Sequence, residues 1–492
     1  MIALLIFLIP LLGGIISFVA GASKKAAHTV FVLSTGALLA LTLLGMTSWD
    51  QPALQRFSAI WLSSLGSSFS LALLPLGKVL CLLTAIVYFL LALYMTNKVV
   101  DRPAAFYGWL LLAQAGMMGV FLAMDALLFY FFWELALIPM YFLCSIWGGP
   151  RRIAVTFKFF VYTFLGSVLL LAGLIYLQSL TPEKSFALDA ILKLKLTTAQ
   201  QSWLLWLVLP AFAIKLPLFP FHTWQPDTYE EAPTPVTAVL SAVMVKMGIL
   251  GLLRWLLPFF PIAAYQWGDV IMGLAVGGIV YASLIAWRQD DLKRLVAYSS
   301  IAHIGLMGAA AFAANTLAIQ GLCFQLFAHG INILGMWLLV DLIERNLGTR
   351  KISELGGLAQ HSPTLTLFMI IIALANIALP LTNGFVGELL MFTGLLATKS
   401  NYYWVLTAVA GLGIILSAVY TLGMIRSVFY GEGNAVTGKP VLVSVPEQLV
   451  LFVIVLLVLF FGLFPQPLLD MTKEYAEQLF SQVDISYLFR KF

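Results

Sequence analysis

The stretch LLFYFFWELALIPMYFL (Leu127–Leu143) holds a single carboxylate, Glu134, with about eight apolar residues on each side. A run of this length and character is predicted to cross a bilayer as a helix, which puts Glu134 near the middle of the membrane. A charged side chain at that depth costs about 2.5 to 3.5 kcal/mol on insertion scales unless it is paired or hydrated. Glu134 therefore needs a specific reason to be where it is.

The composition extends this conclusion from one stretch to the whole chain. Of its 492 residues, 61% are apolar and only 10% are charged, and the mean hydropathy is +0.98. Soluble domains carry about 25% charged residues, so this chain has too little polar surface for water. The three cysteines, Cys81, Cys144 and Cys323, stand in apolar runs without a CxxC partner, which disfavours both disulfides and iron–sulfur ligation. The sequence predicts an all-α polytopic membrane protein.

Fourteen apolar runs are candidate membrane-spanning helices, and the segment 51–71 is expected to be a re-entrant or surface stretch. The runs are 2–20, 28–47, 72–95, 104–122, 126–147, 155–178, 202–221, 234–257, 268–287, 295–313, 316–341, 364–397, 402–429 and 447–465. The first run lacks a basic flank and a cleavage site, so we interpret it as a retained helix rather than a signal peptide.

Basic residues in the loops indicate the orientation of the bundle. Thirteen of them fall on one side and eight on the other, and the richer side is predicted to be cytoplasmic. Both termini are then expected on the outer side. The tail 466–492 mixes Asp470, Lys473, Glu474 and Glu477 with apolar residues, which is typical of an amphipathic segment at the membrane surface.

Two of the expected helices contain prolines at corresponding places. LPL at Leu216–Leu218 and LPL at Leu379–Leu381 are 163 residues apart, and at nearly the same spacing FLGS (Phe164–Ser167) matches AHGI (Ala328–Ile331). This pattern suggests a duplicated unit of five helices, and because five is odd the second copy would be inverted. Inverted repeats that each contain a broken helix are typical of ion sites near the bilayer midplane.

Six ionisable residues lie deep in the apolar runs, one on each of the expected helices five, seven, eight, ten, eleven and twelve. They are Glu134, Lys215, Lys246, His303, His329 and Glu388. Any one of them is explained by a local packing partner, but six independent burial costs would accumulate. A row of titratable groups is the expected form of a proton relay. Moving Glu134 toward or away from Lys215 would switch that lysine between holding and donating a proton.

Other polar groups have simpler interpretations. Lys78 and Arg254 stand nearer helix ends, where snorkelling or loop contacts account for them. Lys158 follows Arg151 and Arg152 and reaches toward the cytoplasmic surface. The loop 222–231 holds His222, Asp227, Glu230 and Glu231, but no pair has metal-ligand spacing, so we expect a proton-entry or structural loop and no metal.

Several of these segments together resemble the antiporter-like, proton-pumping subunits of respiratory complex I (NADH:quinone oxidoreductase), in particular the subunit M type. The most specific are FFWELALIPMYFL with Glu134, KLPLFPFHTWQPDTYEEAPTPV with Lys215, VKMG with Lys246, SSIAHIGLM with His303 and NGFVGELLMF with Glu388. Glu388 favours subunit M, because the sister subunits L and N usually carry lysine there. The family often has Pro-Gly-Thr where this chain has Pro380-Leu381-Thr382.

The resemblance implies one proton channel in a redox-driven pump of the bacterial inner membrane. It implies Glu134 and Lys215 as a modulating pair, Lys246 as the central relay, His303 and His329 as a hydrated bridge, and Glu388 as the terminal group. FMN, iron–sulfur clusters, NADH and quinone are expected in partner subunits and no cofactor in this chain, with L-like and N-like subunits as neighbours. The expected segments are 1–103 (helices 1–3), 104–257 (first repeat), 258–430 (inverted repeat) and 431–492 (helix 14 and tail).

Two other functions fit parts of the sequence. A subunit of a cation/proton antiporter or of a membrane-bound hydrogenase would share the fold and the relay, and neighbouring flavin and iron–sulfur subunits would distinguish complex I from it. A polytopic enzyme acting on lipid would use the 222–231 loop, and it would then depend on His222, Asp227 and Glu230 rather than on Lys215 and Glu388.

Overall fold

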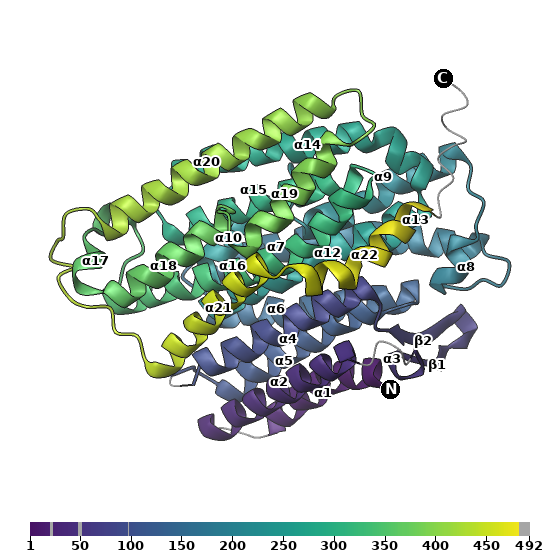
Figure 1. The fold of residues 1–492 in the computed structure, drawn as a ribbon. Coiled ribbons are helices and arrows are strands. Elements are labelled where there is room, and N and C mark those ends of the chain that lie inside the picture. Colours follow the sequence, from purple (N-terminus) through teal and green to yellow (C-terminus); the bar gives the residue numbers. More distant parts are fainter. Residues whose placement is uncertain (20–22, 48–51, 97, 482–492) are drawn as a thin grey trace. The chain divides into compact units, whose positions relative to one another are not determined.

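The computed structural model describes residues 1–19, 23–47, 52–96 and 98–481, and these are mostly helical (Figure 1). Among them, twelve helices are long and apolar enough to cross a membrane. The chain forms two compact units. Unit 1 contains residues 1–216 and 243–267 and those described from 477 onward, and unit 2 contains residues 217–242 and 268–476. The predicted multi-span helical architecture is confirmed, whereas the inverted repeat and its four segments stay predictions.

Unit 1 begins with two helices and a hairpin and continues through a set of long helices. Its elements are α1 (Ile2–Val19), α2 (Lys24–Thr47), α3 (Pro52–Gln55), β1 (Arg56–Leu62), β2 (Ser67–Ala72), α4 (Pro75–Tyr94), α5 (Pro103–Leu122), α6 (Ala126–Trp147), α7 (Arg152–Leu180), α8 (Leu188–Leu192), α9 (Thr198–Lys215), α12 (Lys246–Gly251), the π-helical turn η3 (Leu252–Leu256) and α13 (Leu257–Phe259). Helix α5 packs against α1 and α6, and α7 packs against α9.

Unit 2 contains the remaining helices. They are α10 (Gln225–Glu231), α11 (Thr234–Val239), α15 (Leu292–Phe312), α16 (Thr316–Leu347), α17 (Leu358–His361), α18 (Pro363–Asn376), α19 (Asn383–Leu396), α20 (Tyr403–Phe429), α21 (Val445–Leu463) and most of α22 (Gln466–Ser481). Helix α14 (Pro261–Trp287) and the π-helical turn η2 (Leu240–Met244) each contribute residues to both units. Helix α16 packs along α19 and α15.

The described part of the segment 51–71, expected to be a re-entrant or surface stretch, contains a feature that the sequence did not predict. Residues 56–72 form an antiparallel hairpin in which Arg56 pairs with Ala72. Asp125 joins this hairpin to α6, because its carboxylate accepts from Ser67 Oγ at 2.7 Å and from the Ser68 nitrogen at 3.0 Å. The same carboxylate caps α6 by accepting from two nitrogens of its first turn. The helix that carries Glu134 therefore has a fixed starting point.

Two of the fourteen expected runs contain real interruptions. The run 202–221 stops being helical at Lys215, and the run 364–397 is divided into α18 and α19, each 14 residues long. Between α18 and α19 the backbone has positive φ at Ala378 (56°) and Leu381 (74°). A Cβ at Gly462 of α21 would lie 2.2 Å from the Leu381 oxygen, so only glycine permits this approach. The non-helical segment is thus held in place by its neighbour.

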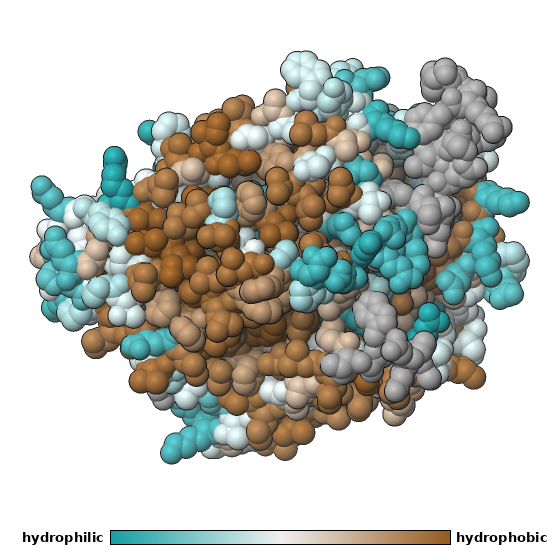
Figure 2. Space-filling view, in the orientation of Figure 1, coloured by the Kyte–Doolittle hydropathy of each residue, from teal (hydrophilic) through white to brown (hydrophobic). Residues whose placement is uncertain are grey.

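The exposed surface of the long helices is apolar, as a lipid-facing surface requires. On α20, the outward-facing residues include Leu412, Ile415 and Leu422, and on α21 they include Phe452 and Leu456. Figure 2 shows apolar side chains gathered along the helices and hydrophilic side chains gathered at helix ends, for example around α17.

The predicted amphipathic tail corresponds to α22. Its residues Leu468, Thr472 and Ala476 recur at helical spacing and are buried, whereas Lys473 and Glu477 are exposed. Residues 482–492 of the predicted tail lie outside the described residues.

Candidate functional site

The six ionisable residues predicted to form the relay divide evenly between the two units. Unit 1 holds Glu134 on α6, Lys215 at the end of α9 and Lys246 at the start of α12. Unit 2 holds His303 on α15, His329 on α16 and Glu388 on α19. Five of the six are buried and Glu134 is half-buried.

Lys215 is at the end of its helix because of the sequence that follows. The residue before a proline disfavours the helical conformation, so Pro217 ends α9 at the preceding residues. The Leu216 nitrogen still donates to the Phe212 oxygen at 2.8 Å, which closes the last turn. A lysine in the last turn of a helix faces unpaired carbonyl groups and the negative end of the helix dipole. The interruption therefore places the Lys215 ammonium at the negative end of a helix dipole, while burial of the side chain opposes its positive charge.

The Lys215 ammonium lies beside an aromatic ring and is not bonded to a carboxylate. Its Nζ is 5.2 Å from the centroid of the Trp133 ring, a distance at which cation–π attraction operates. Trp133 is in turn fixed by its indole nitrogen, which donates to Ser167 Oγ at 3.1 Å. Glu134 interacts electrostatically with Lys215, yet neither Lys215 Nζ nor Glu134 Oε1 has a hydrogen-bond partner among the described residues. The two charges are near each other but are not joined.

The helix of Lys246 packs very closely against the end of α9. A Cβ at Gly248 would lie 2.9 Å from both the Leu216 nitrogen and the Phe212 oxygen, so the two backbones touch at this point. Gly248 is two residues from Lys246, and Leu216 is the neighbour of Lys215. Because of this close approach, the backbone beside Lys215 is in contact with the backbone beside Lys246. π-Helical turns flank α12 on both sides (η2 and η3), and such turns occur often at functional sites.

In unit 2 the ionisable residues are directly bonded. His303 Nδ1 lies 3.0 Å from Glu388 Oε1, and both side chains are about nine-tenths buried. The ring centroids of His303 and His329 are 5.8 Å apart, and His329 Nε2 lies 3.3 Å from Ser300 Oγ. A carboxyl group and an imidazole at hydrogen-bond distance can share or exchange a proton.

A close approach of two helices also supports the His303–Glu388 pair. A Cβ at Gly387 would lie 2.4 Å from the Gln325 Oε1 atom and 2.9 Å from its Cβ, so α19 rests directly on α16 beside Glu388. Helix α19 starts at Asn383, just after the break, and Glu388 is five residues into it. The break and the packing together set the depth of the carboxylate.

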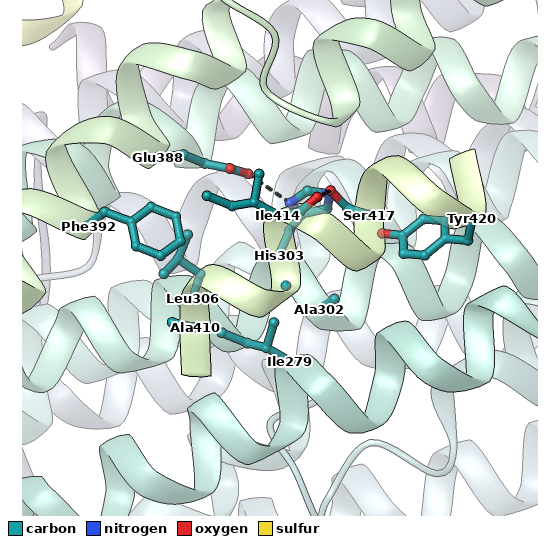
Figure 3. A pocket seen from close by; sticks show the side chains of 11 residues that line it. Ile279, Ala302, His303, Leu306, Glu388, Phe392, Ala410, Ile414, Ser417 and Tyr420 are labelled. Carbon is teal, nitrogen blue, oxygen red and sulfur yellow. Dashed lines mark hydrogen bonds and ion pairs between the residues drawn. The ribbon is translucent and has the colours of Figure 1, made fainter. Parts of the chain in front are cut away.

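A small pocket lies next to this pair (Figure 3). Its polar lining consists of His303, Glu388, Ser417 and Tyr420, and its other walls are mainly apolar side chains of α14, α15, α19 and α20. Figure 3 shows Glu388 joined to His303 by a hydrogen bond, with the Tyr420 hydroxyl pointing toward these polar side chains. The pocket is large enough to hold water beside the carboxylate.

Several residues of these clusters were not predicted from the sequence. Trp133 precedes Glu134 directly and could have been suspected as a cation partner. Ser300 and Tyr420 gave no signal, because serine and tyrosine are common in membrane helices and their partners lie on other helices.

The acidic residues of the 222–231 loop have a structural role. Arg294 Nη1 lies 3.2 Å from Asp227 Oδ1 and 2.8 Å from Glu230 Oε2, and Arg350 binds Glu230 and Asp291. Burial lowers the pKa of Arg350, but its hydrogen bond to Asp291 and the nearby carboxylates outweigh burial and raise it. Arg254 similarly donates to backbone oxygens of Phe121 and Ala123 at the end of α5. Among the described residues, no three His, Cys, Asp or Glu side chains are arranged to hold a metal ion.

Comparison with known proteins identifies the family. Residues 123–415 match the family model described as "NADH:quinone oxidoreductase/Mrp antiporter, TM". The chain belongs to this family. The matched residues include all six buried ionisable residues and both helix interruptions.

Individual members of the family are similar over nearly the whole chain. F(420)H(2) dehydrogenase subunit M of Methanosarcina mazei is 35% identical over 98% of each chain. NADH-quinone oxidoreductase subunit M of Rickettsia prowazekii is 37% identical over 85% of each chain. A chain of respiratory complex I from Thermus thermophilus has a TM-score of 0.88 and 29% identity, covering 97% of this chain and all of that one. The expected resemblance to the subunit M type is confirmed.

Proposed function

We propose that this chain is a proton-translocating membrane subunit of NADH:quinone oxidoreductase (complex I). The observation that carries the proposal is the bonded His303–Glu388 pair, which lies beside a pocket among long, mainly apolar helices. A buried carboxyl–imidazole pair without a metal ligand set around it is suited to taking up and releasing protons. Membership of the NADH:quinone oxidoreductase/Mrp antiporter family supports the same function.

Redox chemistry belongs, in this proposal, to partner subunits. NADH, FMN, iron–sulfur clusters and quinone would be bound there, and L-like and N-like antiporter subunits would be the membrane neighbours. Support comes from the relatives named NADH-quinone oxidoreductase subunit M. The Methanosarcina mazei relative is a subunit of an F(420)H(2) dehydrogenase, so the electron donor has to be tested directly.

Glu134, Lys215 and Lys246 would control the proton in unit 1. At an effective dielectric of 20, opposite charges 4 Å apart attract by about 4 kcal/mol, and the attraction falls as they separate. Because Lys215 is not bonded to Glu134, a small movement of either side chain changes how strongly the lysine holds its proton. Lys246 would accept that proton, since its helix touches the end of α9.

His303, His329 and Glu388 would pass the proton on in unit 2. The two imidazole rings are neighbours, and His303 is bonded to Glu388, so the three groups form a short series. Water in the adjoining pocket would connect Glu388 to the next acceptor.

The proposal is tested with the purified complex in sealed vesicles, by measuring protons moved per electron transferred. Lys215→Ala and Glu388→Gln are expected to leave the complex assembled but to lower this ratio. Lys473→Ala and Glu477→Gln change exposed residues of the same types on α22 and should leave it unchanged. A normal ratio in both buried-site variants would refute the proposal.

The first alternative is a subunit of a cation/proton antiporter or of a membrane-bound hydrogenase. Identification of the co-purifying subunits separates the possibilities, because flavin and iron–sulfur subunits with NADH oxidation are expected only for complex I.

The second alternative, a lipid-modifying enzyme, is disfavoured by the ion pairs of Asp227 and Glu230 with Arg294, which occupy the carboxylates that such an enzyme would use.

The orientation predicted from the loop charges completes the proposal. The richer set of basic loop residues would be cytoplasmic and both termini would face the periplasm. A single cysteine introduced at exposed Lys473 should react with a membrane-impermeant thiol reagent in intact spheroplasts, whereas one at exposed Lys351 should react only after lysis. The opposite pattern would reverse the orientation.

A further inference from the structure

Tyr420 on α20 belongs to the pocket beside Glu388 but has no role in the relay described so far. Its side chain is buried, and its hydroxyl donates to Ser299 Oγ at 3.1 Å. Ser299 is four residues before His303 on α15, so the two side chains lie on the same face of that helix. The tyrosine therefore contacts the relay helix one turn away from the imidazole that bonds Glu388.

Ser299 is shared with the interrupted helix. Asn376, the last residue of α18, donates its side-chain amide to Ser299 Oγ at 3.0 Å. The serine oxygen thus accepts two hydrogen bonds, from Tyr420 and from Asn376, which uses both of its acceptor positions. Its own hydrogen remains available, and a hydroxyl hydrogen rotates freely about the C–O bond.

The two hydroxyls can consequently reverse their bond, whereas the amide cannot. The Asn376 amide nitrogen can only donate, so it stays bonded to the Ser299 oxygen whichever way the bond between the two hydroxyls points. Ser299 can donate to Tyr420 instead of accepting from it, and the Tyr420 hydrogen is then free to point into the pocket. A hydrogen bond donated toward a negative charge is about twice as strong as one between neutral groups, so an ionised Glu388 favours the reversed state.

We propose that Tyr420 is a positioning residue whose hydroxyl turns from Ser299 toward the pocket when Glu388 loses its proton, and turns back when Glu388 regains it. The proposal rests on the proposed function, because it assigns a role within the same relay. Through pocket water, the turned hydroxyl stabilises the carboxylate and helps Glu388 to release its proton. Asn376 holds Ser299 in place and joins this motion to the end of α18.

Among the described residues, His303 is the titratable side chain that is bonded to Glu388. His303 faces it directly, and His329 contacts it through His303. Helix α18 has no titratable residue, and Glu447 of α21 is in the first turn, where it binds Arg345. The remaining ionisable residues of α15, α16 and α20, apart from the thiol Cys323, lie within two turns of a helix end: Lys293, Arg294, Tyr298, Asp341, Glu344, Arg345, Tyr403 and Arg426. Helix α14, which also lines the pocket, carries Tyr265, Asp269 and Tyr281, and the Tyr281 ring packs against Phe219 and His222.

The test is an infrared titration of the purified complex that follows the carbonyl band of protonated Glu388, identified by its loss in Glu388→Gln. In Tyr420→Phe the band is expected to persist to higher pH than in the unmodified complex, by about half a pH unit to one unit. The acid side of the pH profile of proton translocation should move in the same direction. Tyr403→Phe, which removes an exposed hydroxyl from the same helix, should change neither measurement.

The outcomes separate this inference from the function on which it rests. If Glu388→Gln lowers translocation but Tyr420→Phe leaves the Glu388 band at its original pH, the role of Tyr420 is refuted and the relay stands. If Glu388→Gln leaves translocation normal, the relay itself is refuted. The double variant Tyr420→Phe, Glu388→Gln gives a further control. If loss of the Tyr420 hydroxyl still shifts the pH profile of its residual proton translocation, the shift does not act through Glu388, and the role of Tyr420 is refuted.

Discussion

The two units hold their buried ionisable residues in different ways. In unit 1, Lys215 faces an aromatic ring and has no bonded carboxylate, and Lys246 is placed by backbone contact between helices. In unit 2, His303 and Glu388 are bonded at 3.0 Å beside a pocket. Separated charges respond to small movements, whereas a bonded pair exchanges its proton in place. Unit 1 is thus suited to being switched and unit 2 to holding and passing a proton.

The chain contains natural reporters with which each unit can be followed separately. Cys81 and Cys144 are buried in unit 1, and Cys323 is buried in unit 2. Heating the purified complex with a thiol reagent and locating the label by mass spectrometry therefore gives the temperature at which each unit opens. Three of the four predictions that follow use this measurement, the third uses proton translocation, and they are given in order of decreasing effect.

The largest effect is expected when the bonded pair of unit 2 is broken. His303→Ala leaves the buried Glu388 carboxyl without its partner, which should cost about 3 kcal/mol. Cys323 should become reactive at a lower temperature, while Cys81 and Cys144 keep theirs. His361→Ala removes an exposed histidine of the same unit and serves as the control. An equal loss in both variants would mean that the His303–Glu388 bond contributes no stability of its own.

Overpacking the contact between α9 and α12 tests unit 1. Gly248→Ala puts a methyl group 2.9 Å from two backbone atoms, so the helices have to separate at a cost of about 2 kcal/mol. Cys81 and Cys144 should react earlier on heating, and proton translocation should fall because the lysines move apart. Gly277→Ala on α14 has nothing within 4 Å and should be neutral or slightly stabilising. Normal translocation in Gly248→Ala would show that the backbone contact does not position the lysines.

A smaller loss is expected when the aromatic partner of Lys215 loses its anchor. Trp133→Phe keeps a ring near the ammonium but removes the bond to Ser167, worth about 1 kcal/mol. Translocation should decrease in part, less than in Lys215→Ala. The matched change at exposed Trp404 should have no effect. If Trp133→Phe were as severe as Lys215→Ala, the indole would have a direct role in proton transfer.

The smallest effect is a gain in stability at the break in unit 2. Leu381 has a φ of 74°, which a residue with a Cβ adopts only with strain, and its side chain is 65% exposed. Leu381→Gly should therefore raise the opening temperature of Cys323, corresponding to about 1 kcal/mol. Leu379→Gly, in the same segment but without positive φ, should lower it. A loss of stability in Leu381→Gly would show that the leucine side chain matters more than the backbone.

The fold and the buried ionisable residues could be predicted because membranes impose simple rules. A charge within an apolar run has to have a reason, and a proline within such a run has to end or bend the helix. These rules alone single out Glu134, Lys215, Glu388 and the interruptions near Pro217 and Pro380. Leu381, with its positive φ, stands at the position where the resemblance described above leads one to expect glycine.

The bonds between these residues could not be predicted. His303 and Glu388 are 85 positions apart, and their pairing depends on how α15, α16 and α19 pack. The π-helical turns η2 and η3 change the number of residues per turn, so a single helical period cannot give the face on which Lys246 lies. The hairpin of residues 56–72 was missed because its short strands occur in a chain dominated by helices.

The division of one membrane span into α18 and α19 has an electrical consequence. Each helix has 14 residues and is about 21 Å long, shorter than the roughly 30 Å of hydrocarbon that a full span has to cross. Glu388, five residues after the break, therefore lies part of the way through the membrane, and a proton bound there has crossed part of the transmembrane voltage. Full crossing is worth about 2.3 kcal/mol per charge at 100 mV, so half of it changes proton binding by about sevenfold. If Glu388 carries a proton as proposed, we expect its occupancy to depend on membrane voltage as well as on pH.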